Sequence, residues 1–441
     1  MPQRIQLHPR DEREWWQRPA TRSILLFINF FLIILAYYLV KPASRSLFLE
    51  HADAVQLPYV WTASAVLLLA LMPFYQRVLR RFGRLNIVIA TCALIVGLLV
   101  LFRLLMQMPS LEVAVGFYIL VDIFSVVLVE QFWSLTNSVY RSAEGRRWYG
   151  LIASGGLLGG LIGGLAASSI IKTTPLTTPD LLLVAAAIIV VMIAMTLLLA
   201  RHGLYHEHPA LSPAQIATST GAGLRTLRSN TYLALIALML LLSQIIEPIV
   251  EFQFMTLVEQ AYPERESRTA YLSEFLSVLS GFALVVNLLA TPIVHRRLGT
   301  IAGLMVQPLL LGLSAIAFAF QARLPVAAVM KIADRGLSYS INRASRELLY
   351  VPVDPATIYR AKAWIDMVGY RTFKIAGNAL ILLLTQWLPW KLSIAELSWV
   401  VVGICVLWAY GVWTTREYYA SFNRAAMNLR SMNQNVAGAP E

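Results

Sequence analysis

Residues 23–46 read SILLFINFFLIILAYYLVKPASRS. Residues 23–40 of this stretch carry no charge, and a helix that crosses a bilayer core needs about 20 apolar residues. The run then continues into Lys41 and Arg45 and has no small-residue cleavage site, which distinguishes it from a cleavable signal peptide. We therefore expect a retained membrane-spanning helix that carries two cations near its end.

The remainder of the 441-residue chain has the same apolar character. Hydrophobic residues make up 58% and charged residues 14%, whereas soluble globular chains are about 45–50% apolar and about 25% charged. So few charges cannot cover a soluble surface of this size, which excludes intrinsic disorder and disfavours a soluble enzyme. The two cysteines, Cys92 and Cys405, lie inside apolar runs and offer no disulfide framework.

Apolar runs long enough to cross a bilayer recur along the whole chain. They predict an all-α integral membrane protein with twelve transmembrane helices. The expected spans are residues 23–46, 58–76, 86–106, 113–137, 148–171, 180–200, 231–257, 270–294, 301–321, 325–345, 364–388 and 394–415.

The basic residues are distributed unevenly between the two sides that these spans create. Most of the 36 Lys and Arg residues fall in the two tails, the central linker and the loops on one side. The opposite side has Lys172, Arg265, Arg268, Arg323 and Lys391. Because cytoplasmic loops carry the excess of Lys and Arg, we expect a cell (inner) membrane protein with both termini in the cytoplasm. The net charge of +12 is thereby attributed to topology and not to nucleic-acid binding.

Two loops repeat a short basic motif 216 residues apart, close to half the chain length. Arg80-Arg81-Phe82-Gly83-Arg84 in the first half corresponds to Arg296-Arg297-Leu298-Gly299 in the second, and Arg146 and Lys362 have the same offset. Two six-helix pseudo-repeat halves would produce this pattern. The expected division is an N-tail (1–22), a first half (23–200), a linker (201–230), a second half (231–415) and a C-tail (416–441).

Duplicated six-helix halves around a central site are the plan of major-facilitator transporters. The loop around Gly83 resembles the gating motif of that superfamily, G-x-x-x-D-R-x-G-R-R, through Arg81-Phe82-Gly83-Arg84. Gln76 and Arg80 replace the first glycine and the acid of the motif. These basic loops are therefore either gating elements or simple determinants of topology.

The expected spans also contain charged residues that lipid cannot solvate. Each charge at the bilayer centre costs about 2.5–3.5 kcal/mol, so a dozen facing lipid would exceed a typical folding stability of roughly 5–15 kcal/mol. We expect these side chains to face one another or a water-filled cavity. They are Lys41, Arg45, Asp122, Glu130, Glu247, Glu251, Glu274, Lys331, Asp334, Arg335, Arg343, Asp366, Arg371 and Lys374.

Spacing places six of the basic residues in pairs on three helix faces: Lys41 with Arg45, Lys331 with Arg335, and Arg371 with Lys374. Paired cations are typical of a phosphate or polycarboxylate site, and neutralisation by nearby protein acids is the alternative. The predicted substrate site comprises Lys41, Arg45, Glu130, Arg335, Arg371 and Lys374. The residues expected to balance charge or to couple protons are Asp122, Glu247, Glu251, Asp334 and Asp366.

The fifth span has glycine pairs at 155–156, 159–160 and 163–164. Glycines at this spacing predict close helix packing, because a nucleotide-cradling loop would need a strand–turn–helix setting. The histidines at 202, 206 and 208 lie in the linker without a second cluster of ligands, so no metal site is predicted. No ATPase motif or cofactor signature is present, and we expect no cofactor.

Two segments resemble the bacterial and plastid-type ATP/ADP translocase family: EQFWSLTNSVYRSAEGRRWYG (130–150) and RELLYVPVDPATIYRAKAWIDMVGYRTFKIAGN (346–378). The resemblance implies a nucleotide exchanger that uses intramembrane Lys and Glu. By this resemblance Lys41 and Arg45 match the first-span basic pair of the family and Glu130 its fourth-span acid, while Glu251 and Lys374 match its second-half acid and base more loosely. The family motif reads roughly K-E-L-R-D-S, where residues 41–46 read KPASRS.

The sequence thus predicts a secondary transporter, not an enzyme, that moves a small anionic solute by alternating access between its two halves. A nucleotide or another phosphorylated or carboxylated metabolite is the expected solute, and the other expected partners are the lipid bilayer and a coupling proton or counter-anion. Two alternatives remain open: a proton-coupled exporter of a lipophilic or siderophore-like solute, and a lipid-handling protein without a soluble substrate.

Overall fold

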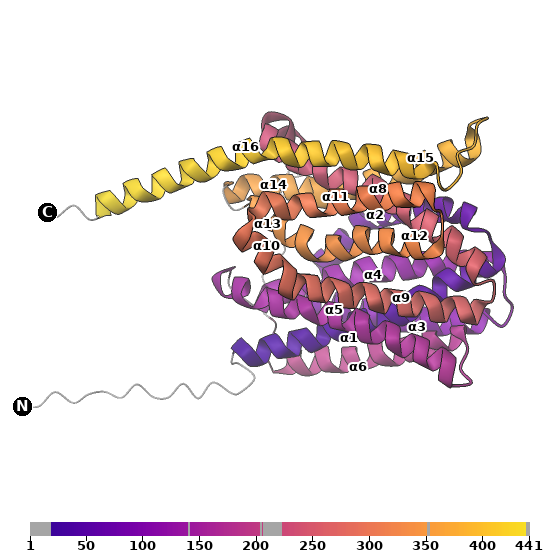
Figure 1. Cartoon of the computed structure of the whole chain (residues 1–441). Helices are drawn as coiled ribbons and strands as arrows, with labels where there is room; N and C mark the ends of the chain where they lie inside the picture. The colour runs from indigo at the N-terminus through magenta and orange to yellow at the C-terminus, as the bar shows by residue number, and fades with distance from the viewer. Residues whose placement is uncertain (1–18, 140–141, 203–204, 206–222, 351–352, 438–441) are drawn as a thin grey trace, which may run out of the picture.

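The computed structural model describes residues 19–437 except for 140–141, 203–204, 206–222 and 351–352, and all its regular elements are helices. The helices run side by side (Figure 1). We call one end of the bundle the terminal end, because the first helix begins there at Pro19 and the last helix extends beyond it. The opposite end is the far end. The first half of the chain forms α1 (Pro19–His51), η2 (Ala54–Gln56), α2 (Leu57–Phe82), α3 (Arg84–Leu105), α4 (Leu111–Val139), α5 (Ser142–Thr173), η3 (Thr178–Asp180) and α6 (Leu181–Arg201).

The second half contains longer helical stretches in which α-helix alternates with π-helical turns. It forms α8 (Thr231–Ala261), α9 (Arg265–Val285), η4 (Val286–Ala290), α10 (Thr291–Arg297), α11 (Gly299–Phe320), α12 (Leu324–Lys331), η5 (Ile332–Gly336), η6 (Ser338–Asn342), α13 (Arg343–Tyr350), α14 (Pro355–Trp364), η7 (Ile365–Gly369), α15 (Tyr370–Leu382), η8 (Leu383–Trp387) and α16 (Leu397–Ala437).

Ten helical stretches among the described residues are long and apolar enough to cross a membrane. They include every predicted span except the tenth and the eleventh. Those two regions, 324–350 and 355–387, are helical but are divided by the π-helical segments η5, η6, η7 and η8. Since π-helical turns are frequent at functional sites, these interruptions draw attention to the charged residues that they carry.

Several predicted boundaries were wrong because they were placed at the first charged residue. α16 continues past the predicted end at residue 415, since residues 412–437 contain no glycine or proline to stop it. α14 begins well before residue 364, because the Asp354 carboxylate caps it by accepting a hydrogen bond from the N–H of Thr357 at 3.0 Å. Most of the predicted linker and of the N-tail lies outside the described residues, although residues 223–229 are helical.

The paired glycines of α5 allow it to approach two helices closely. A Cβ atom added to Gly155 would lie 2.6 Å from the Phe27 carbonyl oxygen of α1, and one added to Gly160 would lie 2.6 Å from the Ser280 hydroxyl of α9. Both distances are too short for a side chain. Helices in lipid associate by such close packing, since lipid tails are as apolar as the helices themselves. The predicted packing role of these glycines agrees with this geometry, which also joins α5 to a helix from the second half.

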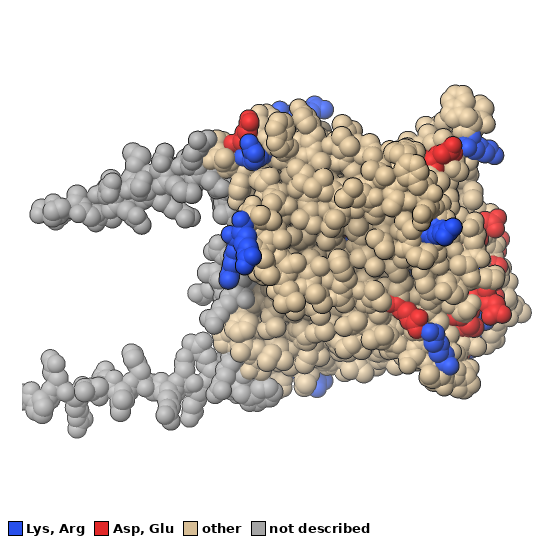
Figure 2. Space-filling model, in the orientation of Figure 1, with Lys and Arg blue, Asp and Glu red and all other residues tan. Residues whose placement is uncertain are grey.

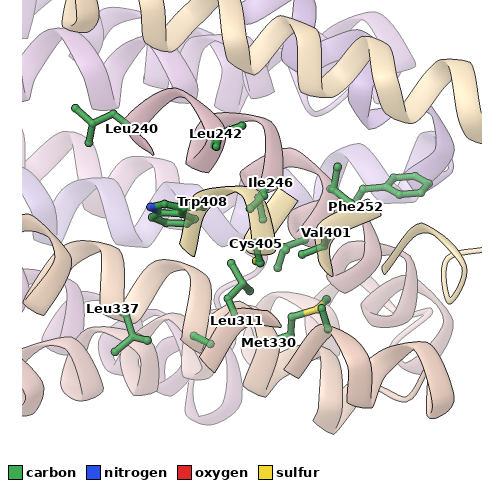
Figure 3. Packing of buried hydrophobic residues seen from close by; sticks show 14 of the residues in the cluster. Leu240, Leu242, Ile246, Phe252, Leu311, Met330, Leu337, Val401, Cys405 and Trp408 are labelled. Carbon is green, nitrogen blue, oxygen red and sulfur yellow. The ribbon is translucent and has the colours of Figure 1, made fainter. Parts of the chain in front are cut away.

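Buried apolar side chains form two clusters. One lies among α1 and α3–α6. The other lies mainly among α8, α11, α12, α15 and α16, and also takes in the far ends of α1 and α2. Figure 3 shows the second cluster, in which Cys405 of α16 lies between Ile246 of α8 and Leu311 of α11, with Trp408 of α16 to one side.

Charges gather at the two ends of the bundle. Figure 2 shows Lys and Arg concentrated at the terminal end, Asp and Glu mainly at the far end, and a broad uncharged band between them. The two loop glycines lie at the terminal end with positive φ, 73° at Gly83 and 83° at Gly299, a conformation that other residues adopt only with strain. They are the glycines with positive φ among the described residues, and they are the pair that the 216-residue offset relates.

Candidate functional site

A cavity of about 390 Å³ lies between the helices, within the roughly 300–1,000 Å³ typical of small-molecule pockets. It is lined from both halves of the chain, by α1, α2 and α4 and by α8, α9, α12, η5, η6 and α15. The structure brings together most of the charged residues singled out in the sequence. The charged lining residues are Lys41, Arg45, Asp122, Glu130, Glu247, Glu251, Lys331, Arg335, Arg371 and Lys374.

The cavity is closed toward the far end and accessible from the terminal end. Apolar side chains cover it on the far side, and Trp61, Phe254, Met255 and Phe275 are all buried there. On the opposite side, the lining residue Glu130 is exposed, and so is Tyr339.

Arg45 is held in place by its neighbours. Its guanidinium Nη2 lies 2.7 Å from Asp122 Oδ1, its Nη1 donates to the Ser44 hydroxyl at 2.8 Å, and its plane lies 4.2 Å from the centre of the Tyr118 ring. Only 9% of the side chain is exposed. Arg45 therefore has less freedom to bind a ligand than its pairing with Lys41 in the sequence suggested.

Lys41 differs from the other cavity cations. Its ammonium lies 5.4 Å from the Tyr37 ring and 5.7 Å from the Tyr38 ring, at cation–π distance. Among the described residues, no carboxylate forms an ion pair with it at 4.0 Å or less. Lys41 is thus a partly buried cation that faces the cavity with its charge uncompensated by a direct acidic neighbour.

The cations of the second half share their acids. Lys331 Nζ lies 2.6 Å from Glu251 Oε2, and Lys374 Nζ lies 3.0 Å from Glu247 Oε1. Arg335 forms a close ion pair with the same Glu247 carboxylate. The Glu247 carboxylate therefore pairs with two cations at once. Arg335 and Lys374 can each accept a further anionic partner.

Four predicted site residues need separate mention. Arg371 and Glu130 line the terminal side of the cavity, where they interact electrostatically. Asp334 does not line the cavity but lies behind it, 3.6 Å from Lys331 Nζ and 3.5 Å from Arg335 Nε. The side chain of Asp366, on η7, lies outside the described residues.

The charge-based prediction missed the aromatic lining. Tyr37, Tyr38, Tyr339 and Tyr370 all line the cavity. Tyr37 and Tyr38 precede Lys41 by four and three residues, so helical spacing places them on the Lys41 face and could have identified them. Lys331, which the predicted substrate site omitted, is in fact a cavity cation with only 6% of its side chain exposed.

The loop residues predicted to gate transport lie away from this cavity, at the terminal end. Arg296 and Arg297 are exposed, Arg84 is partly buried, and the side chains of Arg80 and Arg81 lie outside the described residues. The structure therefore places the two loops on the side from which the cavity is entered. A gating role remains a prediction.

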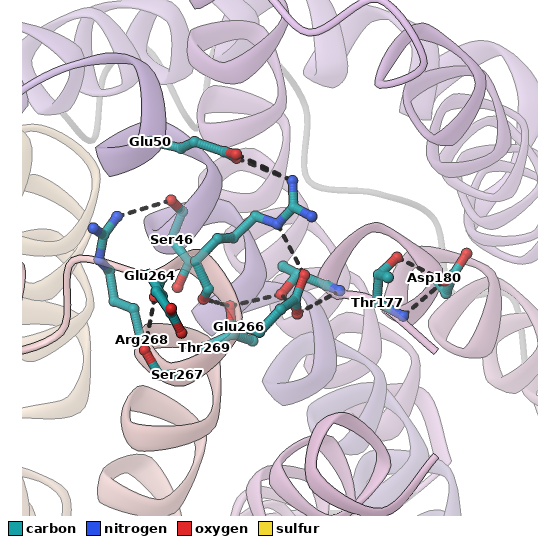
Figure 4. Close-up of polar contacts among 11 residues, drawn as sticks. Ser46, Glu50, Thr177, Asp180, Glu264, Glu266, Ser267, Arg268 and Thr269 are labelled. Carbon is teal, nitrogen blue, oxygen red and sulfur yellow. Dashed lines mark hydrogen bonds and ion pairs between the residues drawn. The ribbon is translucent and has the colours of Figure 1, made fainter. Parts of the chain in front are cut away.

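A second polar cluster closes the far end (Figure 4). We call it the far-end cluster: Ser46 and Glu50 of α1, Thr178 of η3, and Arg265, Glu266 and Arg268 of α9. Arg268 donates hydrogen bonds to the backbone oxygens of Tyr262 at 2.9 Å, Pro263 at 2.7 Å and Ser46 at 3.2 Å. The bond to Ser46 ties the start of α9 to the end of α1, and the other two tie it to the segment between α8 and α9.

The same cluster contains a shared carboxylate. Glu266 accepts hydrogen bonds from the backbone N–H of Thr178 at 2.9 Å and from its hydroxyl at 2.5 Å, and also pairs with Arg265, whose Nη1 lies 3.2 Å from Glu50. Glu274, which the sequence placed among the intramembrane charges, lies at this end too and forms an ion pair with Lys172.

Comparisons with known proteins agree on the family. Residues 110–419 match the family model described as TLC ATP/ADP transporter. The ADP,ATP carrier protein 3 of Rickettsia bellii is 20% identical over 352 residues, covering 68% of this chain and 69% of the carrier. The ADP,ATP carrier protein 1 of Chlamydia trachomatis is 23% identical over 299 residues, covering 59% of this chain, and the chain spans only 57% of the length of that carrier.

The fold has counterparts among solved structures. Two crystal structures of the nucleoside transporter NupG, one of them a point mutant, match with TM-scores of 0.63 and 0.62 and sequence identities of 16% and 15%. They cover 89% and 90% of this chain and 99% of the NupG chain. This likeness shows a fold of the major-facilitator type. Because the family model covers well over half of the sequence, the protein belongs to the TLC ATP/ADP transporter family, whose members are membrane transporters and not enzymes.

Proposed function

We propose that this protein is a secondary transporter that binds a small phosphorylated anion in the central cavity, with an adenine nucleotide as the first candidate. The observation that carries the proposal is the environment of Lys41. Taking a charge out of water is costly unless a partner compensates it, and Lys41 faces the cavity without a carboxylate in direct contact among the described residues. An anionic solute would supply the missing partner.

The other cations would complete the site in different ways. Arg335 and Lys374 share Glu247, so a phosphate could displace or join that carboxylate, with the planar Arg335 guanidinium giving bidentate recognition. Arg371 lies nearer the entrance. Arg45, fixed by Asp122 and Tyr118, would position the far wall of the site, and the surrounding tyrosines offer ring faces for a base or sugar.

The names of the relatives support the choice of an adenine nucleotide. The matching proteins of Rickettsia and Chlamydia are described as ADP,ATP carriers. An exchange of one nucleotide for another would need no energy source beyond the two gradients. Under this proposal the counter-anion occupies the same cavity on the return step.

We propose that transport proceeds by alternating access between two halves, residues 23–200 and 231–415, with the tails 1–22 and 416–441 and the linker 201–230 on one side. In this arrangement the interrupted helical regions 324–350 and 355–387 complete a set of twelve spans. The cavity is closed by the far-end cluster and accessible from the terminal end, which is the arrangement expected of one end state.

The charge distribution supports an orientation. The terminal end carries exposed basic residues such as Arg296 and Arg297, whereas far-end cations such as Lys172 lie among the acidic residues that gather there. Cytoplasmic surfaces of membrane proteins are enriched in Lys and Arg. We therefore place both termini in the cytoplasm and the protein in the inner membrane, so that the structure represents the state open to the cytoplasm. In the opposite state the Gly83 and Gly299 loops, with Arg80, Arg81, Arg84, Arg296 and Arg297, would close the terminal end.

Counterflow in proteoliposomes tests the proposal. Vesicles preloaded with ADP should take up labelled ATP faster than empty vesicles, and Lys41→Ala should abolish the acceleration. Lys362→Ala provides a matched control, because Lys362 pairs with Glu347 at 2.9 Å near the terminal surface and does not line the cavity. Uptake that is independent of internal ADP would contradict nucleotide exchange.

A ligand screen separates the nucleotide from the broader class of anion. Ligands that bind the folded state raise its apparent stability by about 2.7 kcal/mol at a hundredfold excess over Kd. Nucleotides, sugar phosphates and polycarboxylates should be compared by thermal unfolding of the purified protein. Stabilisation by sugar phosphates alone would retain the anion site and exclude the nucleotide, while no stabilisation by any anion would overturn the proposal.

A further inference from the structure

Asp334 is the most buried carboxylate of the charged cluster around the cavity. Its side chain is 4% exposed, whereas Glu247 is 16%, Asp122 20% and Glu251 23% exposed. It lies on the π-helical turn η5, one layer behind the cations that line the cavity. A ligand in the cavity would meet Lys331 and Arg335 before it met Asp334.

The carboxylate of Asp334 lacks the hydrogen bonds that buried acids normally have. Its Oδ2 atom is buried and accepts no hydrogen bond from the described residues. The nearest cationic nitrogens, Lys331 Nζ at 3.6 Å and Arg335 Nε at 3.5 Å, are at ion-pair distance and beyond good hydrogen-bond geometry. Two cations therefore lie beside this carboxylate without a hydrogen bond to its Oδ2 atom from the described residues.

The backbone around Asp334 is firmly held, so the side chain cannot easily move to find better partners. Gln307 of α11 donates a hydrogen bond to the Asp334 carbonyl oxygen at 2.8 Å, and Asn342 donates to Gln307 Oε1 at 2.5 Å. Gly336 packs against the ring of Phe282 on α9. The unpartnered Oδ2 atom is thus a fixed feature of the turn.

The ion pairs around Asp334 are balanced when the cavity is empty, and Lys41 beside them adds one further positive charge. Lys331, Arg335 and Lys374 carry three positive charges, and Glu247, Glu251 and Asp334 carry three negative charges. The charged and titratable groups that face this cluster come from several elements. Arg45, Tyr37 and Tyr38 on α1 and Asp122 on α4 lie on its outer side, toward Glu251, Arg335 and Lys374. The others are closer to Asp334. They are Lys331 on α12, Arg335 on η5, Glu247 and Glu251 on α8, Lys374 on α15, Tyr339 on η6, Cys405 on α16, and Lys41 on α1.

An entering anion would upset this balance. A nucleotide phosphate chain that engages Lys41, Arg335 and Lys374 competes with Glu247 for the last two cations. Such a chain carries more than one negative charge, so after it neutralises Lys41 the cluster holds more negative than positive charge. Adding a proton to a carboxylate restores neutrality, and the cheapest carboxylate to neutralise is the one that is most buried and loses no hydrogen bond. Asp334 meets both conditions.

We propose that Asp334 is a proton-binding site that is loaded when the anion binds. A proton from water in the cavity passes to Asp334 Oδ2 to give a neutral carboxylic acid, and it leaves again when the anion departs. This inference rests on the proposed anion site and adds a coupled proton to it. Anion affinity then rises as pH falls, by up to about tenfold per pH unit for one linked proton.

Calorimetric titration with ADP measures the proton directly. When the binding enthalpy is measured in buffers of different ionisation enthalpy at one pH, the slope gives the number of protons taken up per ADP bound. The contribution of ADP itself follows from its titration in buffer and is subtracted. We expect an excess uptake that approaches one proton in the wild type and disappears in Asp334→Asn.

Three further variants make the assignment specific. Asp334→Glu keeps a carboxyl group and should retain proton uptake at a shifted pH. If Asp334→Asn does not fold, this shift in the pH of proton uptake tests the assignment to residue 334 instead. Glu347→Gln removes an exposed carboxylate at the terminal surface and should leave uptake unchanged. If Glu247→Gln abolishes uptake while Asp334→Asn retains it, the proton belongs to Glu247 and the inference is overturned.

The failure of this inference is distinguishable from failure of the proposed function. ADP that binds the wild type with no excess proton uptake contradicts the proton site and leaves the anion site intact. A wild-type protein that binds no ADP and no other phosphorylated anion contradicts the anion site itself.

Discussion

The cavity and the far-end cluster both join the two halves of the chain with charged side chains, but they use those charges differently. In the far-end cluster, Arg268 is 2% exposed and donates to three backbone carbonyl oxygens. In the cavity, Arg335 and Lys374 share one carboxylate, and Lys41 lies over two tyrosine rings without an ion pair to a carboxylate of the described residues. A buried cation that is fixed by several backbone carbonyl oxygens joins neighbouring segments, and cations that share an acid or lack one can bind a solute.

The comparison predicts that Arg268→Ala reduces stability most. Leaving a buried polar group without its partner costs about 1–3 kcal/mol, and this change removes the donor for three carbonyl oxygens. We expect a loss of about 3 kcal/mol or more, measured by thermal and denaturant unfolding in detergent. Arg323→Ala, at an exposed far-end arginine, is the control, and equal losses in the two variants would contradict the structural role of Arg268.

Lys41→Ala should show the opposite pattern, with weaker ligand binding and nearly unchanged stability. A hydrogen bond to a charged group contributes about 1.5–3 kcal/mol, so the Kd for ADP should rise about ten- to hundredfold. Stability should be nearly unchanged because the substitution leaves no carboxylate without its cation. Calorimetric titration measures the first effect and thermal unfolding the second. Lys41→Arg should keep much of the affinity, and an unchanged Kd in Lys41→Ala would remove Lys41 from the site.

Glu247→Gln tests whether Arg335 and Lys374 bind a ligand more strongly once the carboxylate that they share is removed. The substitution removes the competitor that occupies Arg335 and Lys374 in the empty protein, so the Kd for ADP should fall on the order of tenfold, or about 1.4 kcal/mol. The empty protein should become less stable, because two cations lose their shared acid. A rise in Kd would instead mean that Glu247 contacts the ligand.

The smallest effect should come from Glu50→Gln in the far-end cluster. Glu50 is 35% exposed on its side chain and pairs with Arg265, which is 29% exposed, at 3.2 Å. Exposed ion pairs contribute about 0–1 kcal/mol, so the unfolding temperature should hardly change. A loss similar to that of Arg268→Ala would show that the cluster depends on its ion pairs rather than on its bonds to the backbone.

Much of the fold follows from the sequence because lipid imposes simple requirements. The apolar runs identified the regions that form spanning helices, and the glycine pairs of α5 identified close contacts such as that of Gly155 with Phe27. The boundaries were less predictable, since charged residues such as Arg416 can continue a helix when no glycine or proline stops it. The π-helical turns of 332–342 were also not predicted, because no local sequence pattern distinguishes them from α-helix.

The site was predictable in membership but not in arrangement. Intramembrane charges must avoid lipid, which directed attention to Lys41, Arg335 and Lys374, and these three residues line the cavity. Spacing along one helix could not show that Asp122, on another helix, holds Arg45, or that Glu247 serves two cations. These pairings depend on how α1, α4, α8 and α15 pack, and packing of distant helices leaves no local signal in the sequence.

Cysteine labelling tests the central claim that a water-filled cavity open at the terminal end binds an anion through Lys41. The two native cysteines, Cys92 and Cys405, are buried, and Ser125→Cys would place a thiol on the cavity wall. We predict that a membrane-impermeant maleimide labels this thiol from the terminal side, and that ADP slows the labelling unless Lys41 is replaced by alanine. A thiol that does not react, or that reacts at the same rate with and without ADP, would contradict the account.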